Sequence, residues 1–140
     1  MKTKKYLYII TFVLVMLAFF SWVIFKTNND NESLRKNKTQ TIGIVTDVDL
    51  FPRGDGLYVF YEFKLADNLY KNKTRIFIGH ADLNFTKTIL IHKTLPIIYD
   101  NKNIDNNILL LSKKDFESFE EQRSDSLRRL YNQIDSLWLK

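Results

Sequence analysis

One grouping of side chains in the sequence has the composition of a metal site. His80, Asp82 and His92 would supply two imidazole nitrogens and one carboxylate, a donor set that zinc accepts. A stretch without regular pattern separates the two histidines, and their spacing matches none of the ligand spacings of zinc sites. We therefore expect both histidines at the surface or at the edge of the core, and we expect no metal and no cofactor.

The usual signs of hydrolytic chemistry are also missing. The chain has no cysteine and only four glycines, and it contains neither a Gly-x-Ser-x-Gly elbow nor a Gly-rich phosphate loop. Two carboxylates brought together by folding would leave no sequence motif. We predict a protein that is not an enzyme. The alternative is a ligand-binding or hydrolytic domain of the cell envelope that uses the loop at residues 49–56 with His80 and His92.

The strongest signal in the chain is an apolar stretch at residues 6–25. It contains no charged residue, no proline and no glycine. A helix of this length is roughly 30 Å long, which is the thickness of the hydrocarbon core of a bilayer. The stretch is longer than the apolar region of a signal peptide, and no cleavage site of small residues follows it. We predict that residues 1–27 are a tail and an uncleaved transmembrane anchor, with the lipid bilayer as the partner of residues 6–25.

The positive charge of the chain lies beside this anchor. Residues 1–38 hold seven basic and two acidic residues, which accounts for the net charge of +5, whereas residues 39–140 hold fourteen of each sign. A nucleic-acid-binding domain would need its own basic face, so we predict no nucleic-acid partner. Three lysines in the N-terminal tail favour a cytoplasmic N-terminus, which places the following domain outside the cytoplasm.

A polar stretch at residues 28–38 has no periodicity and is typical of a flexible tether. Residues 39–111 then have the patterns of a small β-domain. Its first strand is predicted at residues 41–48, where apolar residues alternate with polar ones. Three apolar side chains are expected to share the buried face of this strand: Ile42, Ile44 and Val48.

A β-hairpin is the clearest element of this domain. Residues 57–65 alternate between two faces, which predicts Leu57, Val59, Tyr61, Phe63 and Leu65 on one and Tyr58, Phe60, Glu62 and Lys64 on the other. Residues 66–68 predict a tight turn, because Asp67 and Asn68 tolerate the positive φ that hairpin turns require. Residues 69–78 are expected to return antiparallel to the first strand.

The later part of the domain is less regular. We expect an irregular segment at 79–87, short strands at 88–92 and 95–99, a polar loop at 100–107 and a last strand at 108–111. Where the chain turns after residue 99, the side chains of Asp100 and Asn101 are expected to accept hydrogen bonds from backbone amides. The whole domain is predicted as an antiparallel meander or half-barrel of five to six strands.

After residue 111 the pattern changes to that of a helix. Ser112 followed by Asp115 is a weak capping box, and apolar residues recur at intervals of three and four, except at Arg123. We predict one amphipathic helix within residues 112–140. Its apolar stripe has two alternative roles, packing on its own domain or binding a partner protein or a second copy. The stripe consists of Phe116, Phe119, Leu127, Leu130, Ile134 and Leu137.

Three features of residues 41–111 occur together: a Gly-x-Val first strand, an aromatic hairpin at residues 59–63, and a Tyr99-Asp100 pair that ends a late strand. In these features the segment resembles a bacterial family of membrane-anchored β-domains, the domain-of-unknown-function family 3592. The family pattern has prolines where this chain has Asn101 and Ile104. The resemblance implies an α+β protein in a bacterial membrane and brings no activity. We therefore expect a single-pass membrane protein that acts as a non-catalytic interaction or accessory module of the cell envelope.

Overall fold

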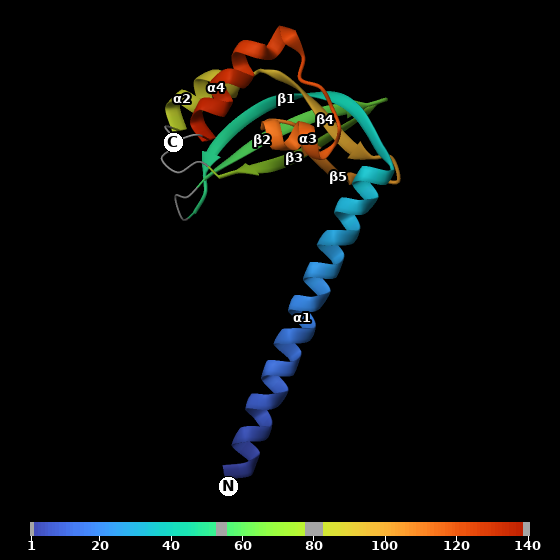
Figure 1. Ribbon diagram of the computed structural model, residues 1–140, viewed down its shortest axis with the longest axis vertical. Coiled ribbons are helices and arrows are strands. Elements are labelled where there is room, and N and C mark those ends of the chain that lie inside the picture. The colour runs from blue at the N-terminus through green and yellow to red at the C-terminus, as the bar shows by residue number, and fades with distance from the viewer. Residues whose placement is uncertain (1, 53–55, 78–82, 139–140) are drawn as a thin grey trace.

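The computed structural model describes residues 2–52, 56–77 and 83–138. The side chains of residues 2–7, 9, 137 and 138 are also outside the described part. Figure 1 shows a long N-terminal helix, α1 (Lys2–Lys36), which carries a small β-domain at its C-terminal end. The protein is α+β, as predicted from the sequence.

The β-domain is a single sheet that curls into a nearly closed barrel. Five antiparallel strands are joined in the order β3-β2-β1-β4-β5. Side chains connect the two edge strands, since Asn72 Nδ2 of β3 donates to Asn107 Oδ1 of β5 at 3.0 Å. The strands are β1 (Lys38–Leu50), β2 (Leu57–Leu65), β3 (Asn68–Ile76), β4 (Thr94–Asp100) and β5 (Asn103–Leu109).

The hairpin of β2 and β3 has the predicted faces, and its turn is one residue shorter than predicted. Leu57, Val59, Tyr61 and Phe63 point inward and are at most 2% exposed. Leu65 pairs with Asn68, so the turn has two residues. The positive φ of this turn falls on Ala66, at 51°, and not on the Asp or Asn that we expected to adopt it. The inward row of β2 forms the centre of the core.

In the first strand, two of the three apolar residues that were predicted to face the core point outward instead. Ile42 is 66% exposed and Ile44 46% exposed, whereas Val45 and Val48 are buried. The inward position between Ile42 and Ile44 is taken by Gly43. A side chain has no room there, because a Cβ would lie 2.2 Å from Ile97 Cδ1. A bulge between Val45 and Asp47 then shifts the register, which returns Val48 to the core.

Helix α1 continues without a break through the segment that we predicted as a tether. It ends at Lys36, two residues before β1, so residues 28–36 are helical. The physical reason is burial: Leu34 is 3% exposed and belongs to the core of the β-domain. The part from Ile10 to Lys36 is long and apolar enough to cross a membrane, and none of its most apolar window is buried.

Two further predictions along the chain are wrong. Residues 83–90 form a short helix, α2 (Leu83–Leu90), where an irregular segment and a strand were expected, and this helix buries Ile89 and Leu90 against the sheet. The polar run before residue 108 belongs mostly to β5, because a tight turn at residues 101–102 leads straight back into the sheet. Asn107 is inside this strand, where its side chain closes the barrel seam.

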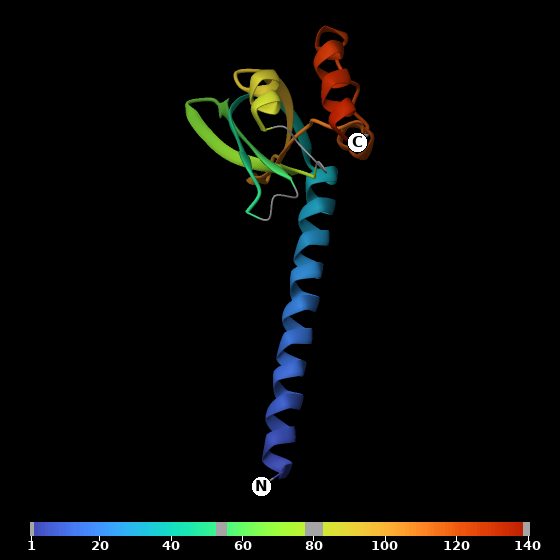
Figure 2. The same ribbon diagram turned by 90° about the vertical axis from the view of Figure 1, so that its left-hand side faces the viewer.

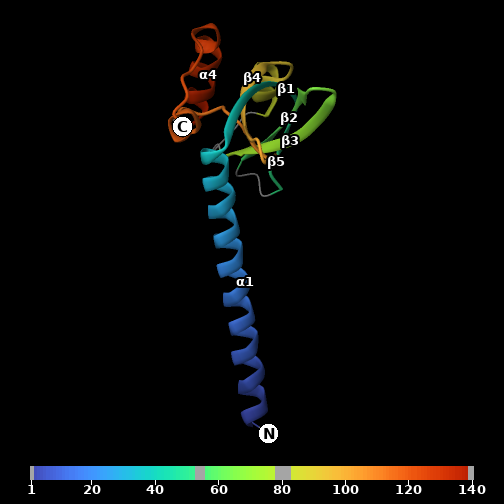
Figure 3. The ribbon, with the colours of Figure 1, turned by 90° about the vertical axis from the view of Figure 1, so that its right-hand side faces the viewer.

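The C-terminal segment is two helices and not one. Ser112 and Asp115 form the predicted capping box at the start of α3 (Lys113–Ser118). The chain turns at Glu120, whose φ is 56°, and after a 3-10 turn (Asp125–Leu127) it continues as α4 (Arg128–Trp138). In Figures 2 and 3, α4 lies beside the barrel and above the upper end of α1.

Candidate interaction surface

The apolar stripe of the C-terminal segment packs on the chain's own domain. Phe116, Phe119, Leu130 and Ile134 are at most 8% exposed and join the core cluster, and Leu127 packs at its edge. Leu137 lies in α4, with its side chain outside the described part. In the folded chain these side chains are buried in the core cluster, so the alternative of packing on their own domain describes the fold. A partner-binding role of the stripe stays a prediction.

Arg123 explains why the stripe is broken. Its guanidinium donates to both carboxylate oxygens of Asp135, at 2.5 and 2.9 Å, and lies 4.9 Å from the ring centroid of Tyr131. This hydrogen-bonded guanidinium lowers the pKa of Asp135. In one continuous helix Arg123 would lie in the apolar stripe. The turn at Glu120 instead places it over the side of α4, where a bidentate ion pair satisfies its charge.

The residues of the ligand-binding alternative are not brought together by the described structure. His92 is exposed and precedes β4, and His80 and Asp82 lie outside the described residues. Asp49 and Leu50 belong to β1, so the described part of the predicted 49–56 loop is Phe51, Pro52 and Gly56. A pocket that gathers these groups would be needed for catalysis or for ligand binding.

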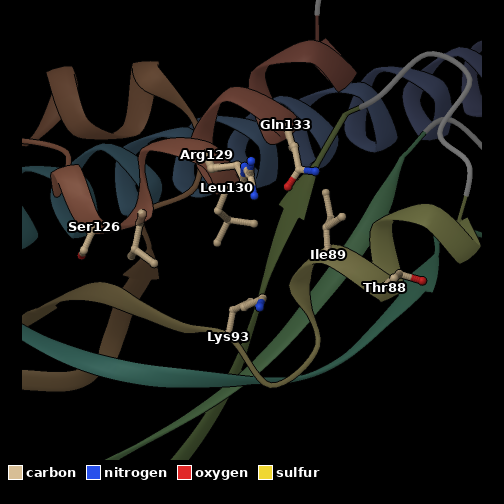
Figure 4. Close-up of a pocket in the computed structure, with 8 residues that line it drawn as sticks. Thr88, Ile89, Lys93, Ser126, Arg129, Leu130 and Gln133 are labelled. Atoms are coloured by element: carbon tan, nitrogen blue, oxygen red, sulfur yellow. The ribbon is translucent and has the colours of Figure 1, made fainter.

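A pocket of about 340 Å³ does lie between α2 and α4, but it has different walls. Figure 4 shows Arg129, Leu130 and Gln133 of α4 opposite Ile89 and Lys93. Neither His92 nor any described residue of the 49–56 segment lines it. Its lining offers two cations and no carboxylate or histidine, so it lacks the acid–base pair that hydrolysis requires.

The junction between α1 and the domain is held by part-buried polar contacts. The hydroxyl of Ser33 donates to Asp100 Oδ2 at 2.5 Å, and the backbone N–H of Lys102 donates to Asp100 Oδ1 at 2.9 Å. These two hydrogen bonds, that of Ser33 first, lower the pKa of Asp100. The predicted turn contact of Asp100 is thus present, and the contact with Ser33 was not foreseen. It ties the end of β4 to α1.

Three other contacts support the same junction. Asn106 Nδ2 donates to the carbonyl of Asp30 at 2.7 Å, and Lys38 Nζ forms an ion pair with Glu121 at 3.1 Å. Lys38 Nζ also donates to the carbonyl of Phe119. Since β4 and β5 contact the last turns of α1, and the tail holds Lys38 at the start of β1, the domain is fixed to the helix and does not hang from a flexible linker.

The outer face of β1, β2 and β3 is the most unusual surface of the described domain. We use the name outer face for the outward side chains of these strands together with the two aromatics that follow β1 and β3. They are Ile42, Ile44, Asp47, Asp49, Tyr58, Phe60, Glu62, Lys64, Leu69, Lys71, Lys73, Arg75, Phe51 and Phe77. Exposed apolar and aromatic side chains that gather on one face are typical of binding surfaces.

One end of this face combines aromatic rings with cations. Lys73 Nζ lies 4.2 Å from the ring centroid of Tyr58, and the guanidinium of Arg75 lies 3.9 Å from that of Phe51. The rings of Phe51 and Tyr58 are themselves 4.7 Å apart, and Phe77 is 57% exposed beside them. We call these five residues and Phe60 the aromatic end. Such cation–π pairs keep the charges exposed while covering part of the rings.

The other end is aliphatic. Ile42, Ile44 and Leu69 are each between 46 and 66% exposed. Together with Lys64 and Thr94 they line a shallow groove of about 340 Å³ on the sheet. We call this the aliphatic end. It adjoins the aromatic end across the row in which Glu62 pairs with Lys71, at 3.6 Å.

Part of this surface was predictable from the sequence. The alternation of β2 placed Tyr58 and Phe60 together on one face but did not predict that this face points outward, and the hairpin register would have placed Lys73 and Arg75 beside them. The positions of Ile42 and Ile44 were missed because a buried glycine reverses the facing of β1. Phe51 and Phe77 lie outside the strands, where no periodic signal exists.

No family model, no curated protein and no solved structure matches this chain. The resemblance to the domain-of-unknown-function family 3592 therefore stays a prediction.

Proposed function

We propose that this chain is a single-pass, membrane-anchored interaction or accessory module of the bacterial cell envelope, without catalytic activity of its own. The main observation behind this proposal is that the outer face exposes apolar side chains. Ile42, for example, is 66% exposed. Monomeric soluble domains rarely leave such side chains clustered without a binding role.

The anchoring of the domain supports the same proposal. Because Leu34 is buried in the core and Ser33 is bound to Asp100, the anchor and the domain form one body. A domain held in this way presents its outer face at a fixed angle to the axis of α1. The lysines of the N-terminal tail favour a cytoplasmic N-terminus, with the domain on the other side of the bilayer.

Photo-crosslinking in native membranes tests the interaction. A crosslinking side chain at Ile44 lies on the outer face, and one at Asn132 of α4, which is also exposed, is the matched control. We expect adducts of the full chain from Ile44 and few from Asn132. Equal labelling from both positions would contradict a specific role of the outer face.

A further inference from the structure

We propose that the aromatic end of the outer face binds the anionic phosphate headgroups of the bilayer that α1 crosses. This inference rests on the proposed function, since it needs the chain to be membrane-anchored. It names the partner of one half of the outer face and leaves the aliphatic end for other contacts.

The first argument is position. Figure 1 shows α1 descending from the lower edge of the domain, and the ends of β1 and β3 lie at this edge, while α2 and α4 lie above. Phe51 follows β1 directly, and Phe77 follows β3 directly. The turn that joins β2 to β3 lies higher. The aromatic end is therefore the part of the outer face that lies nearest to the membrane crossed by α1.

The second argument is distance along α1. Eleven residues, 26–36, separate the apolar stretch from the domain, and at 1.5 Å per residue they raise the domain by roughly 16 Å at most. Headgroups occupy about 5–8 Å of this height, and transmembrane helices tilt by about 20° on average. Because the junction with α1 is fixed, a tilt toward the ends of β1 and β3 lowers the aromatic end onto the headgroups.

The third argument is charge. β3 places Lys71, Lys73 and Arg75 on the outer face at alternate positions. The two carboxylates of β1 nearest in register are Asp47 and Asp49. Asp47 pairs with Lys87 at 3.5 Å, and Asp49 accepts from the backbone of its own strand. Lys71 also pairs with Glu62 at 3.6 Å. Outside these two ion pairs, the cations Lys73 and Arg75 stand beside the single carboxylate of Asp49, which gives the aromatic end a small local excess of positive charge that suits an anionic layer.

The fourth argument is the chemistry of the side chains. Aromatic rings favour the headgroup level of a bilayer, and Phe77, Phe51 and Tyr58 lie together here. Lys73 and Arg75 rest on those rings and are exposed. Arg75 donates one hydrogen bond to the Tyr58 hydroxyl at 3.4 Å, and its other N–H groups can meet phosphate oxygens, to which guanidinium bonds in a bidentate manner. A purely aliphatic surface would not distinguish anionic from zwitterionic lipid.

The test uses the full chain in nanodiscs. Since the chain has no cysteine, a single L50C substitution beside Phe51 carries a fluorophore, and N132C on α4 carries it in the control. The discs contain phosphatidylcholine alone or mixed with phosphatidylglycerol, each with a quencher on the lipid headgroup. We expect quenching at L50C that is strong only with phosphatidylglycerol, falls with added salt, and is absent at N132C.

Two double variants examine the charges. K73Q/R75Q in the L50C background is expected to lower the ratio of docked to free domain roughly 30-fold. Each cation removed is expected to lower this ratio about fivefold, and the two factors multiply. K73R/R75K keeps both charges and is expected to retain most of the docking. Equal quenching in both lipid mixtures, or quenching unchanged by K73Q/R75Q, would overturn the proposal.

Two further readouts separate the possible failures. If L50C is not quenched but the chain resists alkaline extraction from membranes, the headgroup proposal fails while the anchored module stands. If the chain is extracted, the anchor fails as well. If a single-stranded thymidine oligonucleotide changes the L50C signal and phosphatidylglycerol does not, the aromatic end is a nucleic-acid surface and the headgroup proposal is overturned.

Discussion

The two sides of β2 are built from similar residues and meet different surroundings. Inward, Val59, Tyr61 and Phe63 are at most 2% exposed. On the outward side, Tyr58 and Phe60 are half-buried, and the side chain of Lys73 lies over part of both rings. Since inward rings exclude water and outward rings meet water and cations, we expect the inner side to set stability and the outer side to set what the domain binds.

The comparison is sharpest for the two phenylalanines of this strand. Phe63 stacks on Tyr70 and Tyr99, with centroids 5.4 and 6.3 Å away. Phe63→Ala is expected to lower the free energy of unfolding by about 3–5 kcal/mol, because it leaves a cavity. Phe60→Ala should cost about 1 kcal/mol or less. Urea unfolding of the full chain in detergent micelles, followed by circular dichroism, measures both, and equal losses would contradict the division between the two sides.

Gly43 tests the same division on β1. A Cβ at this position would lie 2.2 Å from Ile97 Cδ1 and 2.8 Å from the carbonyl oxygen of Glu62. Because the backbone oxygen cannot easily move away, Gly43→Ala is expected to cost about 1–3 kcal/mol. Ile44→Ala, one residue along on the outer side, is the control and should cost less. The thermal unfolding midpoints rank the two variants, and a larger drop for Ile44→Ala would reverse our assignment of the faces.

The hairpin was predictable because its signals are local. A strict alternation from Leu57 to Phe63 and a two-residue turn between Leu65 and Asn68 fix both the faces and the register. The apolar length of α1 was equally predictable. The same alternation predicted that Tyr58 and Phe60 share one face of β2, whereas the outward direction of this face was not predicted.

The remainder depends on contacts between distant segments. Leu34 makes residues 28–36 helical only because a β-domain is present to bury it. The break at Glu120 depends on the pairing of Arg123 with Asp135. The exposure of Ile42 follows from a glycine that must face Ile97 on another strand. Such contacts leave no periodic signal in the sequence, so periodicity alone assigned these segments wrongly.

Tyr61 is the polar exception on the inner side of β2. Its hydroxyl donates to Asn107 Oδ1 at 2.8 Å, and burial raises the pKa of Tyr61 well above its ordinary value, so it stays protonated as the donor. Tyr61→Phe removes the hydrogen bond at the barrel seam and is expected to cost about 1 kcal/mol. Tyr58→Phe, whose hydroxyl is outward, should be close to neutral. Hydrogen exchange of β5 amides compares them, and equal protection in both variants would show that the seam does not depend on Tyr61.

The smallest expected effect concerns the buried carboxylate of Asp100. Since its pKa is lowered in the folded chain, chiefly by Ser33, the ionised form adds stability at neutral pH. That contribution is complete above the ordinary value of 3.8 for an unfolded aspartate and is lost as the pH falls below it. Unfolding midpoints of the full chain, measured across acidic pH, should therefore show a gap between the native protein and Ser33→Ala that narrows with acidification. A gap that stays constant would mean that Ser33 stabilises the junction by packing and not through the charge of Asp100.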